Sequence, residues 1–388
     1  MPRKLVVLGS TGSIGQQTLD IVRALPGRFQ VVGLAGGRNL TVLERQVEEF
    51  HPQYVYSTAS QGWSAGSLGQ LISMEEMASL PGLDLVVVAT VGTVGLLPTL
   101  AALNAGNRVA LANKEVLVMA GALVTEQARA RGLPLLPVDS EHSAIWQCLR
   151  GEVGESWATW HRSVERLILT ASGGAFRDHT IAQLREVTPA QALIHPNWQM
   201  GPKVTVDSAT LMNKGFEVIE AHWLFGAPYE RIDVVLHRES VVHSLVEFVD
   251  GSLKAQLGPP DMRLPIQYAL TYPERIPGPV ARLDLADLGR LTFGEVDQKR
   301  YPCFRLALEA ARLGGAYPAT LSAADDEAVD LFLRGRIGFT DIPRLISCVL
   351  EAQPACAAST VEGVLAVDAW ARGRAREWAA ARQKPAGA

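Results

Sequence analysis

Two acidic residues, Asp139 and Glu141, stand two positions apart where the apolar run Leu133–Val138 ends. In an extended backbone, residues i and i+2 point to the same side, so the two carboxylates would converge. Converging carboxylates raise each other's pKa unless a cation neutralises them, and a ligand set of oxygens selects Mg²⁺ or Mn²⁺ over zinc. A helix that begins at Ser140, with its acids facing the helix dipole, explains the same residues, so both interpretations stay open.

A second polar segment, residues 206–217, could supply a third carboxylate. If this segment is helical, Asn213 and Glu217 stand at i and i+4 and share one helix face. Ser208, Asn213 and Lys214 offer hydroxyl, amide and ammonium donors, a set that suits a phosphate group. A solvated helix face is the competing interpretation.

A glycine-rich segment, Gly9–Gly15, stands between the predicted strand Lys4–Gly9 and a helix-periodic stretch. Glycines at this place permit a tight turn and let backbone N–H groups approach a pyrophosphate at the helix N-terminus. The spacing is G-x-x-G-x-x-G rather than G-x-G-x-x-G. Its position directly after a buried strand nevertheless favours dinucleotide binding over an ordinary loop.

The residues after the second predicted strand, Phe29–Ala35, indicate which dinucleotide is bound. An NAD enzyme would present an acid near this point to the ribose 2′-hydroxyl, but the strand leads into Gly36–Asn39, which holds Arg38 and no acid. A guanidinium group suits a 2′-phosphate, which a carboxylate would repel. NADP is therefore favoured over NAD, with a solvated loop arginine as the alternative.

Three further segments carry polar groups where predicted strands end or loops begin. Ala112–Glu115 follows a predicted strand, and ligands bind outside the carboxyl ends of strands in open sheets, although a capped helix start explains Asn113 equally well. Ser172–Arg177 is a glycine-rich loop after the predicted strand Glu165–Ala171. His195–Gly201 could be a lid that excludes water, or a static loop anchored by its histidine and tryptophan.

The order of the elements predicts the fold class. Up to about residue 150, near-continuously apolar strands alternate with helical periodicity, which is typical of an α/β, doubly wound, Rossmann-like parallel sheet. From 151 to 285, strand–turn–strand order predicts a central α+β part with an antiparallel or mixed sheet. We expect 286–300 to be a linker and 301–388, which is rich in alanine, to form a small all-α part.

Composition narrows the class of protein further. The 388 residues hold 36 basic and 40 acidic residues, so the net charge is −4 and no basic surplus favours a nucleic-acid partner. The apolar runs are too short for a signal-peptide core or a membrane span, so we expect a cytoplasmic protein without membrane partners. Four scattered cysteines predict reduced, packed thiols: Cys148, Cys303, Cys348 and Cys356.

Taken together, these segments resemble the 1-deoxy-D-xylulose 5-phosphate reductoisomerase family in their order and distances: Gly9–Gly15, Ala112–Glu115, Asp139–His142, Ser172–Arg177, His195–Gly201 and Val206–Glu217. The resemblance continues through 258–263 and 300–303 and so covers nearly the whole chain. It implies the rearrangement of 1-deoxy-D-xylulose 5-phosphate by retro-aldol cleavage and re-aldol joining. NADPH then reduces the product to 2-C-methyl-D-erythritol 4-phosphate, in the methylerythritol phosphate route to isoprenoids.

The resemblance also implies an NADPH-binding part at 1–150, a central catalytic, metal-binding and dimerisation part at 151–285, and a homodimer. It implies that Mg²⁺, Mn²⁺ or Co²⁺ is bound by Asp139, Glu141 and Glu217, which would be catalytic together with Lys114 and His195. The residues matched to the phosphorylated sugar are Lys114, Ser140, Glu141, Ser172, His195, Trp198, Ser208, Asn213, Lys214 and Glu217. The residues matched to the cofactor are Thr11, Gly12, Ser13, Ile14, Gly37, Arg38, Asn39, Asn113, Glu115 and Gly201.

One departure and two rival functions accompany this interpretation. In the helical part the family usually reads Leu-Asn-Ala-Ala-Asn-Glu, whereas this chain has Leu-Ser-Ala-Ala-Asp-Asp-Glu at 321–327, which puts local capping or interface details in question. A metal-independent NADP dehydrogenase of a phosphorylated sugar would share the dinucleotide domain without needing all three acids. A non-catalytic NADP sensor would bind the cofactor and turn nothing over.

Overall fold

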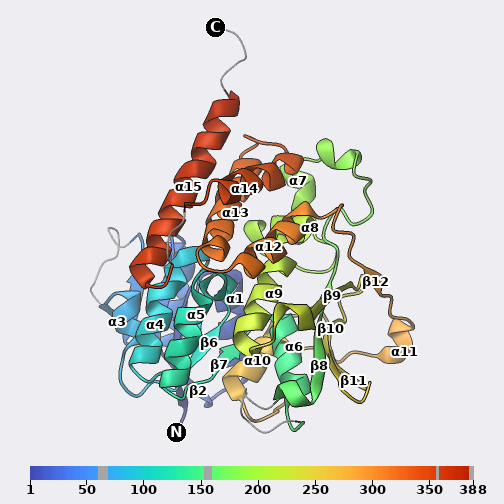
Figure 1. Cartoon of the computed structure of the whole chain (residues 1–388). Helices are drawn as coiled ribbons and strands as arrows, with labels where there is room; N and C mark the ends of the chain where they lie inside the picture. The colour runs from blue at the N-terminus through green and yellow to red at the C-terminus, as the bar shows by residue number, and fades with distance from the viewer. Residues whose placement is uncertain (60–68, 153–159, 355–357, 384–388) are drawn as a thin grey trace. The chain divides into compact units, whose positions relative to one another are not determined.

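Apolar runs near the N-terminus form a seven-stranded sheet in which every neighbouring pair of strands is parallel (Figure 1). Its order is β4-β3-β2-β1-β5-β6-β7, so the chain winds outward in both directions from β1, which confirms the doubly wound α/β prediction. The strands are β1 Arg3–Leu8, β2 Phe29–Gly36, β3 Tyr54–Ser57, β4 Gln70–Leu71, β5 Leu85–Val88, β6 Val109–Leu111 and β7 Leu135–Pro137.

The helices of this region alternate with the strands. They are α1 Ser13–Ala24, α2 Leu40–Phe50, α3 Met74–Ala78, α4 Leu96–Asn104, α5 Lys114–Ala130 and α6 Ser140–Leu149. All four residues of β5 are buried, as expected for a parallel strand that is covered on both faces.

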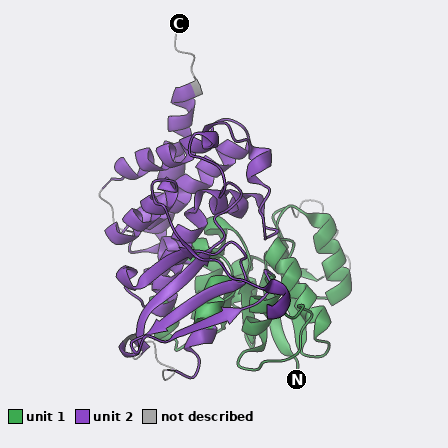
Figure 2. Ribbon diagram, turned by 90° about the vertical axis from the view of Figure 1, so that its right-hand side faces the viewer, with its two compact units in different colours: residues 1–116, 124–146, 261–282 green, residues 117–123, 147–260, 283–388 purple. Residues whose placement is uncertain are grey.

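This computed structural model describes residues 1–59, 69–152, 160–354 and 358–383, and it divides into two compact units (Figure 2). Unit 1 comprises residues 1–116, 124–146 and 261–282, and unit 2 comprises 117–123, 147–260 and 283–388. Among the described residues, no helix combines the length and apolar composition that crossing a bilayer requires. Cys356 lies outside the described residues. Of the described cysteines, Cys148 and Cys303 are buried and Cys348 is half-buried, and none of the three is in a disulfide.

Residues 261–282 return to unit 1, although we predicted them within the central part. The reason is α10, Arg263–Thr271, which packs on α1 and contributes Ile266, Ala269 and Leu270 to the apolar core of the parallel sheet. Arg3 extends this attachment, since its Nη1 donates to the Leu270 carbonyl over 2.8 Å. Burial of an apolar helix face over a distant core is not visible in local periodicity.

Unit 2 contains a mixed five-stranded sheet in the order β11-β10-β8-β9-β12. Its strands are β8 Val164–Ala171, β9 Ile232–Leu236, β10 Val242–Phe248, β11 Leu253–Leu257 and β12 Gly294–Glu295. The β8–β9 pair is parallel and the other pairs are antiparallel, as the strand–turn–strand pattern predicted.

The helices of unit 2 are α7 Pro189–Ala192, α8 Pro202–Thr210, α9 Met212–Phe225, α11 Leu285–Leu288, α12 Pro302–Leu313, α13 Tyr317–Leu333, α14 Ile342–Glu351 and α15 Val361–Gln383. Helix α9 packs on β8 and β9 with one face and on α12 with another, where Gly215 allows close contact with Ala307. One apolar cluster joins α8 and α9 to α12–α15, which stack together in Figure 1. The bounds of the two units therefore differ from the predicted parts 151–285, 286–300 and 301–388. The division into three domains stays a prediction.

Candidate functional site

In unit 1, the glycine-rich turn after β1 fits a bound anion. Gly9 has φ +89° and a Cβ there would lie 2.4 Å from the Ala89 carbonyl oxygen, while a Cβ on Gly15 would lie 2.2 Å from the Gly9 oxygen. Gly12 caps α1 without any side-chain hydrogen bond, so the first N–H groups of the helix face outward for a ligand. Thr11, Gly12, Ser13 and Ile14 all lie in this turn or in the first residues of α1.

The end of β2 reaches the same turn. A Cβ on Gly36 would touch the Thr11 methyl group at 3.0 Å, and the Gly37 amide lies 3.5 Å from Thr11 Oγ1. Arg38 follows with an exposed side chain, while Asn39 caps α2 by accepting from the Val42 amide over 3.2 Å. The predicted cofactor residues that follow β1 and β2 therefore lie close together at the carboxyl ends of these two strands.

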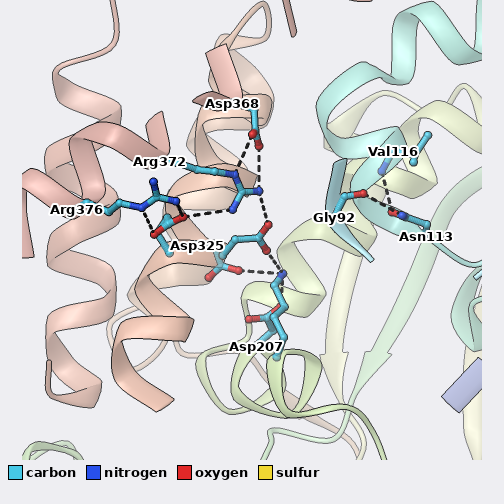
Figure 3. Close-up of polar contacts among 11 residues, drawn as sticks. Gly92, Asn113, Val116, Asp207, Asp325, Asp368, Arg372 and Arg376 are labelled. Carbon is cyan, nitrogen blue, oxygen red and sulfur yellow. Dashed lines mark hydrogen bonds and ion pairs between the residues drawn. The ribbon is translucent and has the colours of Figure 1, made fainter. Parts of the chain in front are cut away.

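The side chain of Asn113, which follows β6, caps helix α5. Its Oδ1 accepts from the Val116 amide over 3.2 Å, and its Nδ2 donates to the Gly92 carbonyl over 2.9 Å (Figure 3). The sequence left open whether Asn113 caps the start of a helix, and the structure shows that it does. Glu115, in the first turn of α5, is buried.

Asp139 ends the segment after β7 and contacts Lys114, whose Nζ lies 2.5 Å from Asp139 Oδ2. Helix α6 begins at Ser140, so the helix-start interpretation is correct and the extended-backbone argument for Asp139 and Glu141 is wrong. The two carboxylates nevertheless offer oxygens within 4.8 Å of one another. Ser140 Oγ donates to Glu141 over 2.5 Å.

In unit 2, His195 joins the loop after β8 to the end of α8. Its Nε2 lies 2.9 Å from Ser172 Oγ and 3.1 Å from Ser208 Oγ. Its Nδ1 accepts from the amides of Asn197 and Trp198 over 3.1 and 2.9 Å. Because two N–H groups face Nδ1, we assign the proton of the neutral ring to Nε2, which then points at the two hydroxyl groups.

The His195 ring is neutral at ordinary pH. Burial, and then the positive charge of Arg177, lower the pKa of His195 to about 4. Arg177 was not singled out from the sequence, although it closes the segment Ser172–Arg177. It donates to the carbonyls of Ser172 and Arg238 over 3.2 and 3.0 Å and so ties the loop after β8 to a neighbouring loop.

Two glycines let that loop approach α8. Gly173 and Gly174 have φ of +84° and +72°, and a Cβ on Gly174 would lie 2.4 Å from the Ser208 carbonyl oxygen. The Gly174 amide donates to Ser172 Oγ over 3.2 Å, and Tyr301 donates to the Gly173 carbonyl over 3.1 Å. Ser172 and Ser208 therefore become neighbours because two residues of this loop lack side chains.

The third predicted acid, Glu217, lies in α9. The segment 206–217 is two helices rather than one, since α8 ends at Thr210 and Leu211 adopts φ 57° before α9 begins. Asn213 Nδ2 still donates to Glu217 Oε1 over 2.5 Å, and the Lys214 ammonium contacts Glu217 Oε2. The predicted i, i+4 pair is confirmed, and the solvated face is wrong because Lys214 and Glu217 are buried.

The loop 195–201 carries the remaining predicted residues. Trp198 is half-buried, with its ring centroid 5.9 Å from that of His243, and Gly201 caps α8. Asn197 Nδ2 donates to the carbonyls of Arg238 and Glu239, both over 3.0 Å, which anchors the base of this loop.

Unit 1 has the architecture of a dinucleotide-binding domain, and unit 2 gathers hydroxyl, imidazole, ammonium and carboxylate groups that suit a small anionic substrate. The class that these features define is a dinucleotide-dependent oxidoreductase. Comparison with known proteins identifies the family: residues 5–121 match the family model "1-deoxy-D-xylulose 5-phosphate reductoisomerase", and 135–225 and 257–374 match its two C-terminal domain models. The chain belongs to the 1-deoxy-D-xylulose 5-phosphate reductoisomerase family.

Relatives and solved structures match nearly the whole chain. A reductoisomerase of Pelotomaculum thermopropionicum is 50% identical, with 95% of this chain and 97% of the relative covered, and one of Geobacillus kaustophilus is 52% identical, with 95% and 98% covered. A crystal structure of DOX-P reductoisomerase with NADPH, fosmidomycin and magnesium is 41% identical, has a TM-score of 0.94 and covers 98% of this chain and 99% of its own. The Zymomonas mobilis enzyme with NADPH is 39% identical, has a TM-score of 0.88 and covers the same shares.

Proposed function

We infer that this protein converts 1-deoxy-D-xylulose 5-phosphate to 2-C-methyl-D-erythritol 4-phosphate, using NADPH and a divalent cation, in isoprenoid precursor synthesis. The observation that carries this conclusion is the similarity to named reductoisomerases over 95% of the chain. The rival dehydrogenase and the sensor would not need both the acids of unit 1 and the donor cluster of unit 2.

NADPH binds, in this proposal, to unit 1. The start of α1, where Gly12 provides no side-chain cap, would accept the pyrophosphate, and the exposed Arg38 after β2 would pair with the 2′-phosphate. The further contacts proposed for the cofactor in unit 1 are Thr11, Gly12, Ser13, Ile14, Gly37, Asn39, Asn113 and Glu115. The family resemblance adds Gly201, which belongs to unit 2. Asn113 would act through its backbone or through the loop that it holds, because its side chain already caps α5 and binds Gly92.

The divalent cation would be bound by Asp139, Glu141 and Glu217. The donor chemistry fits: within unit 1, two carboxylates offer oxygens within 4.8 Å of one another, and within unit 2 the buried Glu217 offers a carboxyl group that the Lys214 ammonium contacts. Carboxylate oxygens suit Mg²⁺ or Mn²⁺, and Co²⁺ is also compatible with such a site. When bound, the cation polarises the substrate carbonyl.

The substrate phosphate would bind where Ser172, His195 and Ser208 meet, with Asn213 and Lys214 as further donors. The His195 Nε2 proton is held toward the two serines, so an arriving phosphate oxygen finds aligned donors and no ring rotation is needed. Because the ring is neutral, it donates a hydrogen bond without placing a full positive charge on the phosphate.

The reaction breaks one carbon–carbon bond of the substrate and forms another, which gives an aldehyde isomer. NADPH then transfers hydride to the aldehyde carbon, and a proton completes the alcohol. Lys114, held 2.5 Å from Asp139, would stabilise negative charge on substrate oxygens, together with Ser140. Trp198, on the loop 195–201, would cover the bound substrate and exclude water.

Consumption of NADPH in the presence of 1-deoxy-D-xylulose 5-phosphate tests this proposal. We expect turnover that stops on exhaustive chelation and returns when Mn²⁺ is added. Turnover that survives chelation would favour the metal-independent dehydrogenase. Cofactor binding without turnover on any sugar phosphate would favour the sensor.

We also propose a cytoplasmic homodimer that acts without nucleic-acid or membrane partners. The homodimer is supported by the family resemblance, and the absence of nucleic-acid partners by the net charge of −4. Sedimentation equilibrium of the full chain tests the dimer: a mass of one chain at micromolar concentration would contradict it.

A further inference from the structure

A buried ion cluster inside unit 2 surrounds the Lys203 ammonium and includes Asp207 and Asp325, which Figure 3 labels. Lys203 Nζ lies 2.7 Å from Asp207 Oδ2 in α8, and 3.1 and 3.4 Å from Asp325 Oδ2 and Asp326 Oδ1 in α13. The side chains of Asp207 and Asp325 are 2% and 0% exposed. Two fully buried carboxyl groups therefore share one ammonium group.

The neighbouring cations of α15 are engaged with other acids. Arg372 lies 2.7 Å from Asp326 and 2.9 Å from Asp368, and Arg376 lies 2.6 Å from Glu327 (Figure 3). Among the described residues, the ion-pair partner of Asp325 is Lys203. A second ionised carboxylate beside Asp207 would be costly in this place, because burial strongly disfavours a charge that is not neutralised.

We propose that Asp325 is a neutral carboxylic acid in the folded protein, and that it is a positioning residue for Ser208. Burial, and next the Asp207 carboxylate, raise the pKa of Asp325 well above its usual range. Among the described residues, the titratable and charged groups beside the pair include Lys203 from α8, Asp326 from α13 and Cys303 from α12, and Arg372 of α15 pairs with Asp326. Burial is the main cause that raises the pKa of the Cys303 thiol, so the thiol is also neutral.

Substitution by asparagine imitates a neutral Asp325. Asparagine and a protonated aspartic acid have nearly the same shape, and each is an uncharged hydrogen-bond donor and acceptor.

The pair is connected to the candidate phosphate site through one helical turn. Asp207 directly precedes Ser208, and its carbonyl accepts from Thr210 Oγ1 over 3.2 Å just before α8 ends. Ser208 Oγ in turn lies 3.1 Å from His195 Nε2. Ionisation of Asp325 at alkaline pH would place a second negative charge against Asp207 and displace the turn that carries Ser208; this step rests on the proposed function.

Asp325→Asn, compared with the wild-type chain and with Asp330→Asn, tests the proton assignment. Asp330 is a half-buried control on the same helix that pairs with Arg334. A raised pKa in the folded state contributes stability below the unfolded pKa, and this stability is lost as pH rises toward the folded pKa. We expect the difference in thermal unfolding midpoint, Asp325→Asn minus wild type, to increase by roughly 2–4 °C per pH unit between about pH 5 and about pH 8. A constant or shrinking difference over this range would overturn the proposal, since an ionised, salt-bridged Asp325 predicts it.

Two measurements keep the proposal testable if Asp325→Asn does not fold or does not turn over substrate. The infrared spectrum of the wild-type chain at about pH 7 should hold the carbonyl band of a buried protonated carboxyl group, and its absence would refute the proposal whatever the protein's activity. For the positioning role, KM for 1-deoxy-D-xylulose 5-phosphate should rise more steeply with alkaline pH in the wild type than in Asp325→Asn, while kcat changes equally in both. Parallel KM profiles would remove the link to Ser208 but leave the infrared and stability results standing.

Discussion

His195 has two separable roles, and two substitutions distinguish them. Its Nδ1 accepts from the amides of Asn197 and Trp198, and its Nε2 points at Ser172 and Ser208. Asparagine places an oxygen near the position of Nδ1 but has nothing at Nε2. Glutamine places an N–H group near Nε2 but leaves the two loop amides without their acceptor.

The magnitudes follow from the contacts that each variant loses. His195→Asn removes one donor to the phosphate, and a hydrogen bond to a charged group contributes about 1.5–3 kcal/mol, which is about a 10- to 150-fold loss of kcat/KM. His195→Gln keeps this donor and frees two amides of a half-buried loop, at a cost of about 1–2 kcal/mol because water can replace part of the contact. We expect that cost mainly in loop closure, and therefore in kcat.

Steady-state kinetics with both substrates separates the two outcomes. His195→Asn should raise KM for 1-deoxy-D-xylulose 5-phosphate while KM for NADPH stays unchanged, whereas His195→Gln should lower kcat with a smaller effect on KM. His51→Asn is the control, because His51 is exposed in unit 1 and has φ 47°, which asparagine tolerates. A wild-type KM in His195→Asn, or a reversed pattern between the two variants, would refute the assigned tautomer and its role.

Four further outcomes are expected. Glu217→Gln should lower turnover at least about 100-fold while NADPH binding, followed by fluorescence, persists; near-normal turnover would remove Glu217 from the metal site. Arg38→Ser should raise KM for NADPH about 10- to 100-fold and leave KM for NADH nearly unchanged, and equal weakening of both would show that Arg38 does not bind the 2′-phosphate. Gly174→Ala combines φ +72° with a contact of 2.4 Å and should cost more than about 2 kcal/mol in urea unfolding, against about 1 kcal/mol for Gly251→Ala, which has φ +83° and open space; equal costs would contradict the close approach to Ser208. Because the pKa of His195 falls to about 4 in the folded state, this residue contributes stability above its unfolded pKa of about 6.5, and acidification from there toward pH 4 should destabilise the wild type more than His195→Asn.

The elements that the sequence predicts well are those in which every local preference agrees. β5 is buried on all sides and reads as four apolar residues in a row, and the glycines at 9 and 15 are required by approaches of 2.4 and 2.2 Å to backbone oxygens. In both cases one local property, burial or the lack of a side chain, decides the outcome. The parallel sheet and its ligand-binding turn could therefore be predicted from the sequence.

Where a strand is followed directly by a helix, the local sequence pattern predicted the wrong backbone conformation. The spacing of Asp139 and Glu141 suggested an extended backbone, but Ser140 starts α6, and the Asp139 carboxylate accepts from the Ser140 amide over 3.0 Å. The two acids still lie close together, because residues in the first turn of a helix gather around its N-terminus. A correct expectation of nearby acids thus came from an incorrect backbone conformation.

Contacts between distant segments could not be predicted from one sequence. Helix α10 returns to the parallel sheet after more than one hundred residues of another unit, and no local pattern distinguishes its apolar face from that of a helix packed nearby. Asp325 is a sharper case, since an aspartate inside an alanine-rich helix is expected to face solvent. Helices α8 and α12 bury it, and only their packing brings Asp207 and Lys203 to it. Aspartic acid and asparagine differ little in size, yet in a buried cluster the acid adds a titratable proton, so the consequence of an aspartate at this position depends wholly on the fold around it.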